Sequence, residues 1–302
     1  MADGSIAQVE EAVDGSMVAA VAAGSIAGRQ HSHHPVSREP DAPLAFLTAA
    51  AAAEGHHVGP CVVVVRTREE FVRLLREGVP GLQWLQVEGL LGDEEVWATA
   101  AQGAATPALD VILGDPAAEF SGLYRLADVR IVRQVRVTMR AAPGFMKALR
   151  LAAALQLPVR LLPGQPSAEA LAELTAAAHF YLRDPMVETP VEFFHSLLAA
   201  FRGMGDGTLW RFLEEDPAVL SHGDVAGRTL HPPDSVESHL TRLLEDGAEC
   251  ATCRWLPVCA GYFKWPDPTY ACAGVKELFA TLEAAAEEIG RDLASQEIPA
   301  AP

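Results

Sequence analysis

Four of the five cysteines of this 302-residue chain lie between positions 250 and 272, in the order Cys250-x2-Cys253-x5-Cys259-x12-Cys272. A tight loop turns two cysteines that are separated by two residues to the same side, and the wider gaps let later cysteines close the site from the opposite side. This spacing predicts that Cys250, Cys253, Cys259 and Cys272 together bind one metal centre.

The spacing alone suits two kinds of centre, a [4Fe–4S] cluster and a structural zinc ion with four thiolates. Apolar and aromatic side chains surround the cysteines and would shield a cluster from water and tune its potential. These side chains are Trp255, Leu256, Pro257, Val258, Tyr262, Phe263 and Trp265. Gly261 permits a close approach of the backbone to the site. Cys61 stands apart in an apolar run and is interpreted as a packed core thiol.

A second candidate site is the pair Glu192 and His195, three residues apart on one face of a predicted helix. Such a pair can ligate a metal or move protons, although a packing pair on a helix explains the same spacing. Further acidic and histidine residues in predicted loops could approach it; these are Asp184, His222, Asp224 and His231. The chain contains neither a phosphate-binding glycine loop nor a Gly-x-Ser-x-Gly elbow.

The composition narrows the classes of partner. Lys and Arg number 23 against 40 Asp and Glu, a formal charge of −17, and so acidic a surface disfavours nucleic acid. No apolar run approaches the roughly 20 residues of a membrane-spanning helix, and the acidic N-terminal residues do not resemble a secretory signal. We therefore expect a cytoplasmic protein without membrane or nucleic-acid partners. In that compartment clustered cysteines hold metal more often than they form disulfides.

The patterning divides the chain into four regions. Residues 1–45 are rich in Ala, Gly, Ser and acid, and are expected to form a flexible tail that carries His31, His33 and His34. In residues 46–185 predicted strands alternate with predicted helices, which indicates a parallel α/β sheet, either open or bent into a partial (β/α) barrel. Residues 186–245 are expected to form a helical bridge, and residues 246–302 the cysteine domain with a closing helix.

The expected elements can be given by residue number. Strands are predicted at 61–66, 82–87, 109–113, 129–132, 135–139 and 158–162. Helices are predicted near 93–103, 116–127, 144–156, 167–181, 191–201, 209–214, 238–244 and 275–289.

The segment Cys250-Ala-Thr-Cys253-Arg-Trp-Leu-Pro-Val-Cys259-Ala-Gly-Tyr, closed by Cys272, resembles the C-terminal SPASM domain of radical SAM peptide maturases. The preceding α/β region is similar in kind to the partial (β/α)6 barrel of those enzymes. The resemblance implies a small SPASM-like iron–sulfur domain, in which the four cysteines are the ligands of one auxiliary [4Fe–4S] cluster.

Two departures from the family limit the implied chemistry. The chain contains no Cys-x3-Cys-x2-Cys motif, so no cluster that binds S-adenosylmethionine is expected. Phe263 stands where the family has a ligand of a second auxiliary cluster. The resemblance therefore implies a degenerate member without radical SAM activity. It would act as an accessory protein in the modification of ribosomally made peptides (RiPP-type) and bind a precursor peptide or a partner maturase.

Two alternatives stay open at this point. The first is an enzyme that reuses the barrel cavity with Glu192 and His195. The second is a zinc-stabilised binding module.

Overall fold

The structure, a computed structural model, describes residues 44–55, 59–102, 107–205, 207–215, 220–221 and 235–296. Its central element is a sheet of seven parallel strands in the order β6-β5-β4-β3-β2-β1-β7. The strands are β1 Leu44–Thr48, β2 Cys61–Val65, β3 Leu82–Glu88, β4 Ala108–Leu113, β5 Val135–Arg140, β6 Val159–Leu162 and β7 Leu220–Ser221. From β1 to β6 each strand pairs with the next along the chain, so their order never reverses as it does in a doubly wound sheet.

Helices connect the strands and continue after them. The connecting helices are α2 Ala49–Ala53, α3 Arg68–Glu77, α4 Glu94–Gln102, α5 Pro116–Glu119, the 3-10 helix η1 Phe120–Arg125, α6 Leu126–Val132 and α7 Phe145–Ala154. The later helices are α8 Ala168–Arg183, α9 Glu192–Phe201, α10 Leu209–Phe212, α11 Val236–Glu245, η2 Glu249–Thr252, α12 Leu256–Cys259, η3 Tyr262–Lys264 and α13 Ala273–Gln296. In the described ranges no helix combines the length and apolar character that a membrane crossing requires.

Local signals explain where several helices begin. Thr67 caps α3 by accepting from the amide of Glu70, whose carboxylate bonds back to the cap, and this reciprocal pair satisfies two amides that would otherwise lack partners. The hydroxyl of Ser167 caps α8 by accepting from the amide of Ala170, and the hydroxyl of Ser235 caps α11 by accepting from the amide of Ser238.

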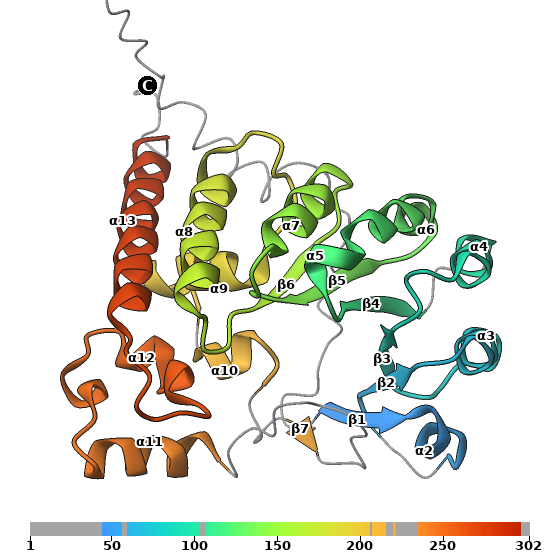
Figure 1. Ribbon diagram of the computed structural model, residues 1–302, viewed down its shortest axis with the longest axis horizontal. Helices are drawn as coiled ribbons and strands as arrows, with labels where there is room; N and C mark the ends of the chain where they lie inside the picture. The colour runs from blue at the N-terminus through green and yellow to red at the C-terminus, as the bar shows by residue number, and fades with distance from the viewer. Residues whose placement is uncertain are drawn as a thin grey trace, which may run out of the picture.

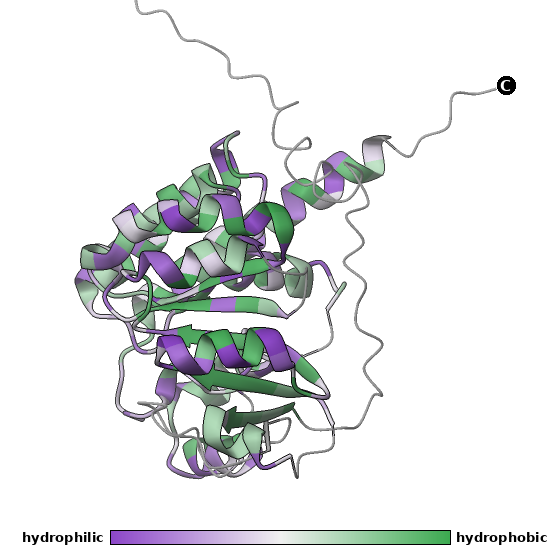
Figure 2. Cartoon of the chain, turned by 90° about the vertical axis from the view of Figure 1, so that its right-hand side faces the viewer, coloured by the Kyte–Doolittle hydropathy of each residue, from purple (hydrophilic) through white to green (hydrophobic). Residues whose placement is uncertain are grey.

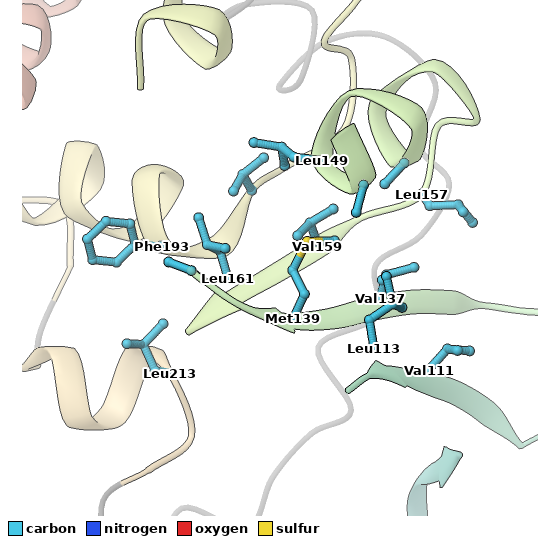
Figure 3. Packing of buried hydrophobic residues seen from close by; sticks show 14 of the residues in the cluster. Val111, Leu113, Val137, Met139, Leu149, Leu157, Val159, Leu161, Phe193 and Leu213 are labelled. Carbon is cyan, nitrogen blue, oxygen red and sulfur yellow. The ribbon is translucent and has the colours of Figure 1, made fainter. Parts of the chain in front are cut away.

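The two faces of the sheet differ. Alternate residues of each strand point to the face covered by α3, α4, α6 and α7, where they form one continuous apolar core with those helices. Part of this core, including Val111, Leu113, Val137 and Leu149, is drawn in Figure 3. Hydropathy follows the same division, since the strands are largely apolar and the covering helices carry hydrophilic residues (Figure 2).

The opposite face of the sheet is apolar at one end and polar in the middle. Leu44, Phe46 and Val62 form a small apolar cluster on β1 and β2. On β3 to β6 the corresponding positions are buried polar side chains, namely Gln86, Asp110, Arg136, Thr138 and Arg160. We call these five residues, with Glu214 and Glu192, the inner-face network.

The C-terminal elements form a separate cap at one end of α13. Figure 1 shows α13 alongside α8 and α9, with α12 and α11 below its first turn. The cap comprises α11, η2, α12, η3 and the loop to Cys272. It is the part of the chain that carries the four clustered cysteines.

The parallel α/β architecture predicted from the alternating pattern is confirmed, and most strands and helices lie within a few residues of the expected positions. The strand predictions need three corrections. Residues 129–132 belong to α6, where Leu126 and Val129 face the core one helical turn apart, so tertiary packing overrides the strand preference of this β-branched run. The first strand is β1 rather than β2, and β7 adds a short strand after residue 185, where none was expected.

Candidate metal centre

The four clustered cysteines line one cavity in the cap. Cys250 lies in η2, Cys253 follows it, Cys259 ends α12, and Cys272 precedes α13. With Trp255 and other apolar side chains they line one cavity of about 20 Å³. The four cysteines that the sequence predicts to share one site therefore line the same cavity.

The backbone between the cysteines turns tightly. The amide of Cys253 donates to the carbonyl of Cys250 at 3.1 Å, which closes the 3-10 turn of the Cys-x2-Cys segment. After Cys259 the chain adopts left-handed conformations at Ala260 (φ 46°) and Gly261 (φ 73°). A side chain at Gly261 would also place its Cβ 2.8 Å from Cδ1 of Leu243, so glycine is favoured there by conformation, and a larger residue would displace the Leu243 side chain.

Burial makes the thiols weak acids in the metal-free chain. It raises the pKa of Cys259 to about 11 and that of Cys272 to about 12, and it raises the pKa of Cys250 as well. The neighbouring cysteines add to the effect in each case, because a second thiolate repels the first. A bound metal would lower the pKa of the thiols, because it displaces their protons and compensates the negative charge of the thiolates.

Two lysines beside the thiols supply positive charge. Lys264, which is buried, lies 2.9 Å from the carboxylate of Glu249, and Lys276 bonds to the same carboxylate. Hydrogen bonds from Lys276 and Lys264 lower the pKa of Glu249 to about 2. Glu249 also accepts from the amide of Cys272 at 3.2 Å, so this ion-paired group ties together both ends of the cysteine segment. Lys264 favours the thiolate forms of Cys250 and Cys272.

One buried donor at the cavity lacks a partner. Trp255 lines the cavity, and its indole Nε1 is buried without a hydrogen-bond acceptor among the described residues. Buried N–H groups are rarely left unpaired, and the thiolate or sulfide sulfurs of a metal cluster accept hydrogen bonds. Phe263 and Phe279, whose rings lie 5.8 Å apart, complete the apolar wall. The donor set, the cavity and the orphaned N–H fit a group with several sulfur atoms.

Hydrogen bonds fix the cap to the rest of the molecule. The indole N–H of Trp210 in α10 donates to the carbonyl of Ala260 at 3.0 Å, and the ring of His239 in α11 lies 3.1 Å from the carbonyl of Gly261. Tyr262 donates to Glu215 at 2.5 Å, and Gln165, after β6, donates to the carbonyl of Phe263 at 3.0 Å. The cysteine loops are therefore held in place from both the sheet and the helices.

Glu192 and His195 have different partners. Glu192, at the start of α9, forms an ion pair with Arg136 of the sheet at 3.7 Å. Nδ1 of His195 lies 3.3 Å from the hydroxyl of Tyr181 in α8, and burial lowers the pKa of His195. Burial raises the pKa of Glu192 to about 7, with Arg136 opposing the shift.

The other residues singled out by the sequence fall into two groups. Asp184 accepts from the amide of Met186, next to the end of α8. His31, His33, His34, His222, Asp224 and His231 lie outside the described residues. Cys61 is buried in the core of the sheet, and burial raises the pKa of its thiol to about 11, as expected of a packed thiol.

The inner-face network is a polar centre that the sequence analysis missed. Asp110 is fully buried and accepts from Arg136 (3.1 Å), Arg160 (3.2 Å), Thr138 (2.5 Å) and Gln86 (3.2 Å). Burial alone would raise the pKa of Asp110, but the two arginines outweigh it and hold the pKa below its usual value. Charged residues inside the short apolar strands were the available signal, because a buried strand tolerates a charge only when it is paired.

Glu214, two residues after the end of α10, completes this network. Its carboxylate accepts from Arg136 at 2.7 Å and from Arg160 at 2.5 Å. The residue adopts a left-handed backbone (φ 55°), a conformation that costs about 1 kcal/mol or more outside glycine. The next residue, Glu215, accepts from Tyr262 of the cap. The end of α10 thus connects the buried arginines of the sheet to the cysteine cap.

Comparisons with known proteins give no relative. No family model, curated protein or solved structure matches the chain. In the described part of the chain, no group of three or more His, Cys, Asp or Glu side chains is positioned to hold a metal ion. The four thiols instead face a common volume.

Proposed function

We propose that the chain is a SPASM-like iron–sulfur protein without radical chemistry, and that it serves as an accessory or peptide- and partner-binding component in peptide modification. The observation that carries the proposal is the single cavity lined by Cys250, Cys253, Cys259 and Cys272. One [4Fe–4S] cluster held by these four thiolates would be its cofactor.

The unpaired N–H in the cavity wall favours a cluster over zinc. A tetrahedral zinc ion with bonds of about 2.3 Å draws its four sulfurs into contact around one point. A cubane cluster keeps its thiolates apart, because each binds a different iron at a separate corner. The unpaired Trp255 N–H in the wall of the shared cavity suits the second arrangement, because a cluster adds sulfide sulfurs that can accept a hydrogen bond.

The N-terminal half supports descent from a radical SAM barrel. Strands β1 to β6 follow one another in sequence, and helices cover one face, as in a partial (β/α) barrel. The carboxyl end of the first strand, where that family places its cysteine triplet, continues here into the alanine helix α2. No thiol stands in α2, so S-adenosylmethionine is not an expected cofactor.

The ligand count indicates the role of the cluster. With four protein thiolates every iron is coordinated, which leaves no open site for a substrate and fits structural or electron-transfer duty. The bonds of Trp210 and Tyr262 fix the cap to α10. A cluster that orders this cap would present a fixed surface to a peptide or a partner enzyme.

An enzymatic role is the second candidate. It is favoured by the raised pKa of Glu192, about 7, which suits a group that exchanges protons near neutral pH. His195 is turned to Tyr181, so Glu192 would act with Arg136 rather than with His195.

Selection from a displayed library of random peptides tests the accessory role. The bait is the full-length chain, purified without oxygen and immobilised with its metal retained. We expect enrichment of related sequences that is lost with a Cys259→Ser bait. If a bait with a full complement of iron enriches nothing beyond the empty matrix, the peptide-binding role is wrong even though the cluster stands.

A further inference from the structure

A second cavity lies at the carboxyl edge of the sheet, away from the cysteines. It measures about 320 Å³ and is lined by residues at the ends of β3, β4, β5 and β6. This size is within the range of about 300–1,000 Å³ typical of small-molecule sites. Ligands of parallel α/β sheets bind at this edge, because the loops after the strands converge there.

The charged groups of this cavity are of both signs. Arg140, the last residue of β5, lines it, and within the described ranges its guanidinium forms no hydrogen bond or ion pair. It interacts electrostatically with the Tyr262 hydroxyl, which donates to Glu215 in the cavity wall. Glu119 lines another part, where its Oε2 accepts from the amide of Asp115. Glu88 is the third carboxylate of the lining and is ion-paired with Arg66 at 2.8 Å. An unpaired cation therefore shares one small volume with three carboxylates, of which Glu119 and Glu215 have no cationic partner in an ion pair among the described residues.

Other lining residues are either apolar or polar side chains that buried hydrogen bonds hold in place. Leu113, Met139 and Leu162 contribute hydrocarbon surface. Arg160 and Thr138 form a polar section of the wall, and both are held in place by Asp110, so they cannot turn towards a ligand without breaking buried bonds. Arg140 is thus the cation available to a ligand, and the apolar residues provide room for a hydrocarbon group.

We propose that this cavity binds the zwitterion of a free α-amino acid with an apolar side chain. The α-carboxylate would pair with Arg140, the α-ammonium with Glu215 or Glu119, and the side chain would lie against Leu113, Met139 and Leu162. Arginine suits a carboxylate because its planar fork donates two parallel hydrogen bonds. The proposal goes beyond the proposed function and does not depend on the metal centre, so either can fail alone.

Isothermal titration calorimetry of the full-length chain tests it with three probes: L-leucine, N-acetyl-L-leucine and L-leucinamide. The last two each remove one charge of the zwitterion and mimic the two ends of a peptide. We expect L-leucine to bind with a Kd of about 1 mM or below, and each derivative to bind about tenfold more weakly or worse.

Three variants sharpen the result. Arg140→Gln and Glu215→Gln should each weaken L-leucine binding by about tenfold or more, whereas Arg130→Gln, an exposed arginine on α6, should leave it unchanged. Gln at position 215 keeps an acceptor for Tyr262, and unchanged thermal midpoints without ligand show that both site variants fold. The proposal is overturned if L-leucine gives no heat, if N-acetyl-L-leucine binds equally well, which would indicate a peptide carboxyl end, or if Arg140→Gln binds normally.

Discussion

The inner-face network and the cysteine cap are both buried polar centres, but they differ in how their ionisable groups are balanced. In the network the carboxylates of Asp110 and Glu214 form ion pairs with the guanidiniums of Arg136 and Arg160. In the cap the thiols raise one another's pKa, and the N–H of Trp255 has no acceptor among the described residues. The difference shows that the carboxylates of the chain itself balance the arginines of the network, and it agrees with the proposed metal centre in the cap.

Removal of one thiolate should have the largest effect. Cys259→Ser is expected to abolish iron binding and to destabilise the cap by several kcal/mol, because structural metal sites contribute on the order of 10 kcal/mol to folding. Iron analysis and urea unfolding, followed by tryptophan fluorescence, measure both quantities. Cys61→Ala, a buried cysteine outside the cap, is the control and should retain its iron. Full iron content in Cys259→Ser would contradict the assignment of this ligand.

Neutralising the centre of the network should have the next largest effect. Asp110→Asn leaves Arg136 and Arg160 underpaired, and breaking a buried ion pair costs about 3–5 kcal/mol. Urea unfolding should show this loss while the iron content per folded chain stays unchanged. Asp128→Asn, an exposed residue of α6, should change stability by less than about 0.5 kcal/mol. Equal effects of the two substitutions would show that the network adds nothing.

The titration of Glu192 should contribute to the pH dependence of the free energy of unfolding. Burial raises its pKa from 4.5 to about 7, so between these values the folded state holds a proton that the unfolded state has released. Its contribution to stability is therefore complete below pH 4.5 and is lost as the pH rises through 7. Glu192→Gln should remove a pH-dependent part on the order of 1–3 kcal/mol. Unfolding free energies measured from pH 4.5 to 8 in both proteins check this, and parallel curves would refute it.

The smallest expected effect concerns the unpaired indole. Trp255→Phe keeps the apolar wall but removes the N–H, which would otherwise stabilise negative charge on the cluster sulfurs. One hydrogen bond of about 1 kcal/mol corresponds to roughly 40 mV for a one-electron couple, and its loss lowers the reduction potential. A redox titration monitored by electron paramagnetic resonance measures the shift. Trp97→Phe, on α4, serves as control, and an unchanged potential in Trp255→Phe would exclude the hydrogen bond.

The sequence anticipated what depends on local pattern. The alternating apolar runs predicted the parallel sheet, and the cysteine spacing predicted four residues that line one cavity. Strand β1 escaped detection because Leu44–Thr48 runs directly into the alanine-rich segment 49–53 and gains its strand pairing only through β2 and β7.

The polar sites could not be predicted in the same way. The partners of Asp110 come from three different strands, β3, β5 and β6, and their approach depends on sheet register. The carboxyl-edge cavity likewise combines residues from 86 to 215 that share no motif. Glu192 and His195 were paired by helical spacing, but the elements that pack on each side of α9 gave them separate partners.

The most direct test of the metal centre is the iron, zinc and acid-labile sulfide content of the full-length chain purified without oxygen, together with its visible spectrum. We expect about four irons and four sulfides per chain and a broad absorption near 400 nm that bleaches on reduction. One zinc without sulfide, or no metal at all, would contradict the assignment of a [4Fe–4S] cluster to Cys250, Cys253, Cys259 and Cys272.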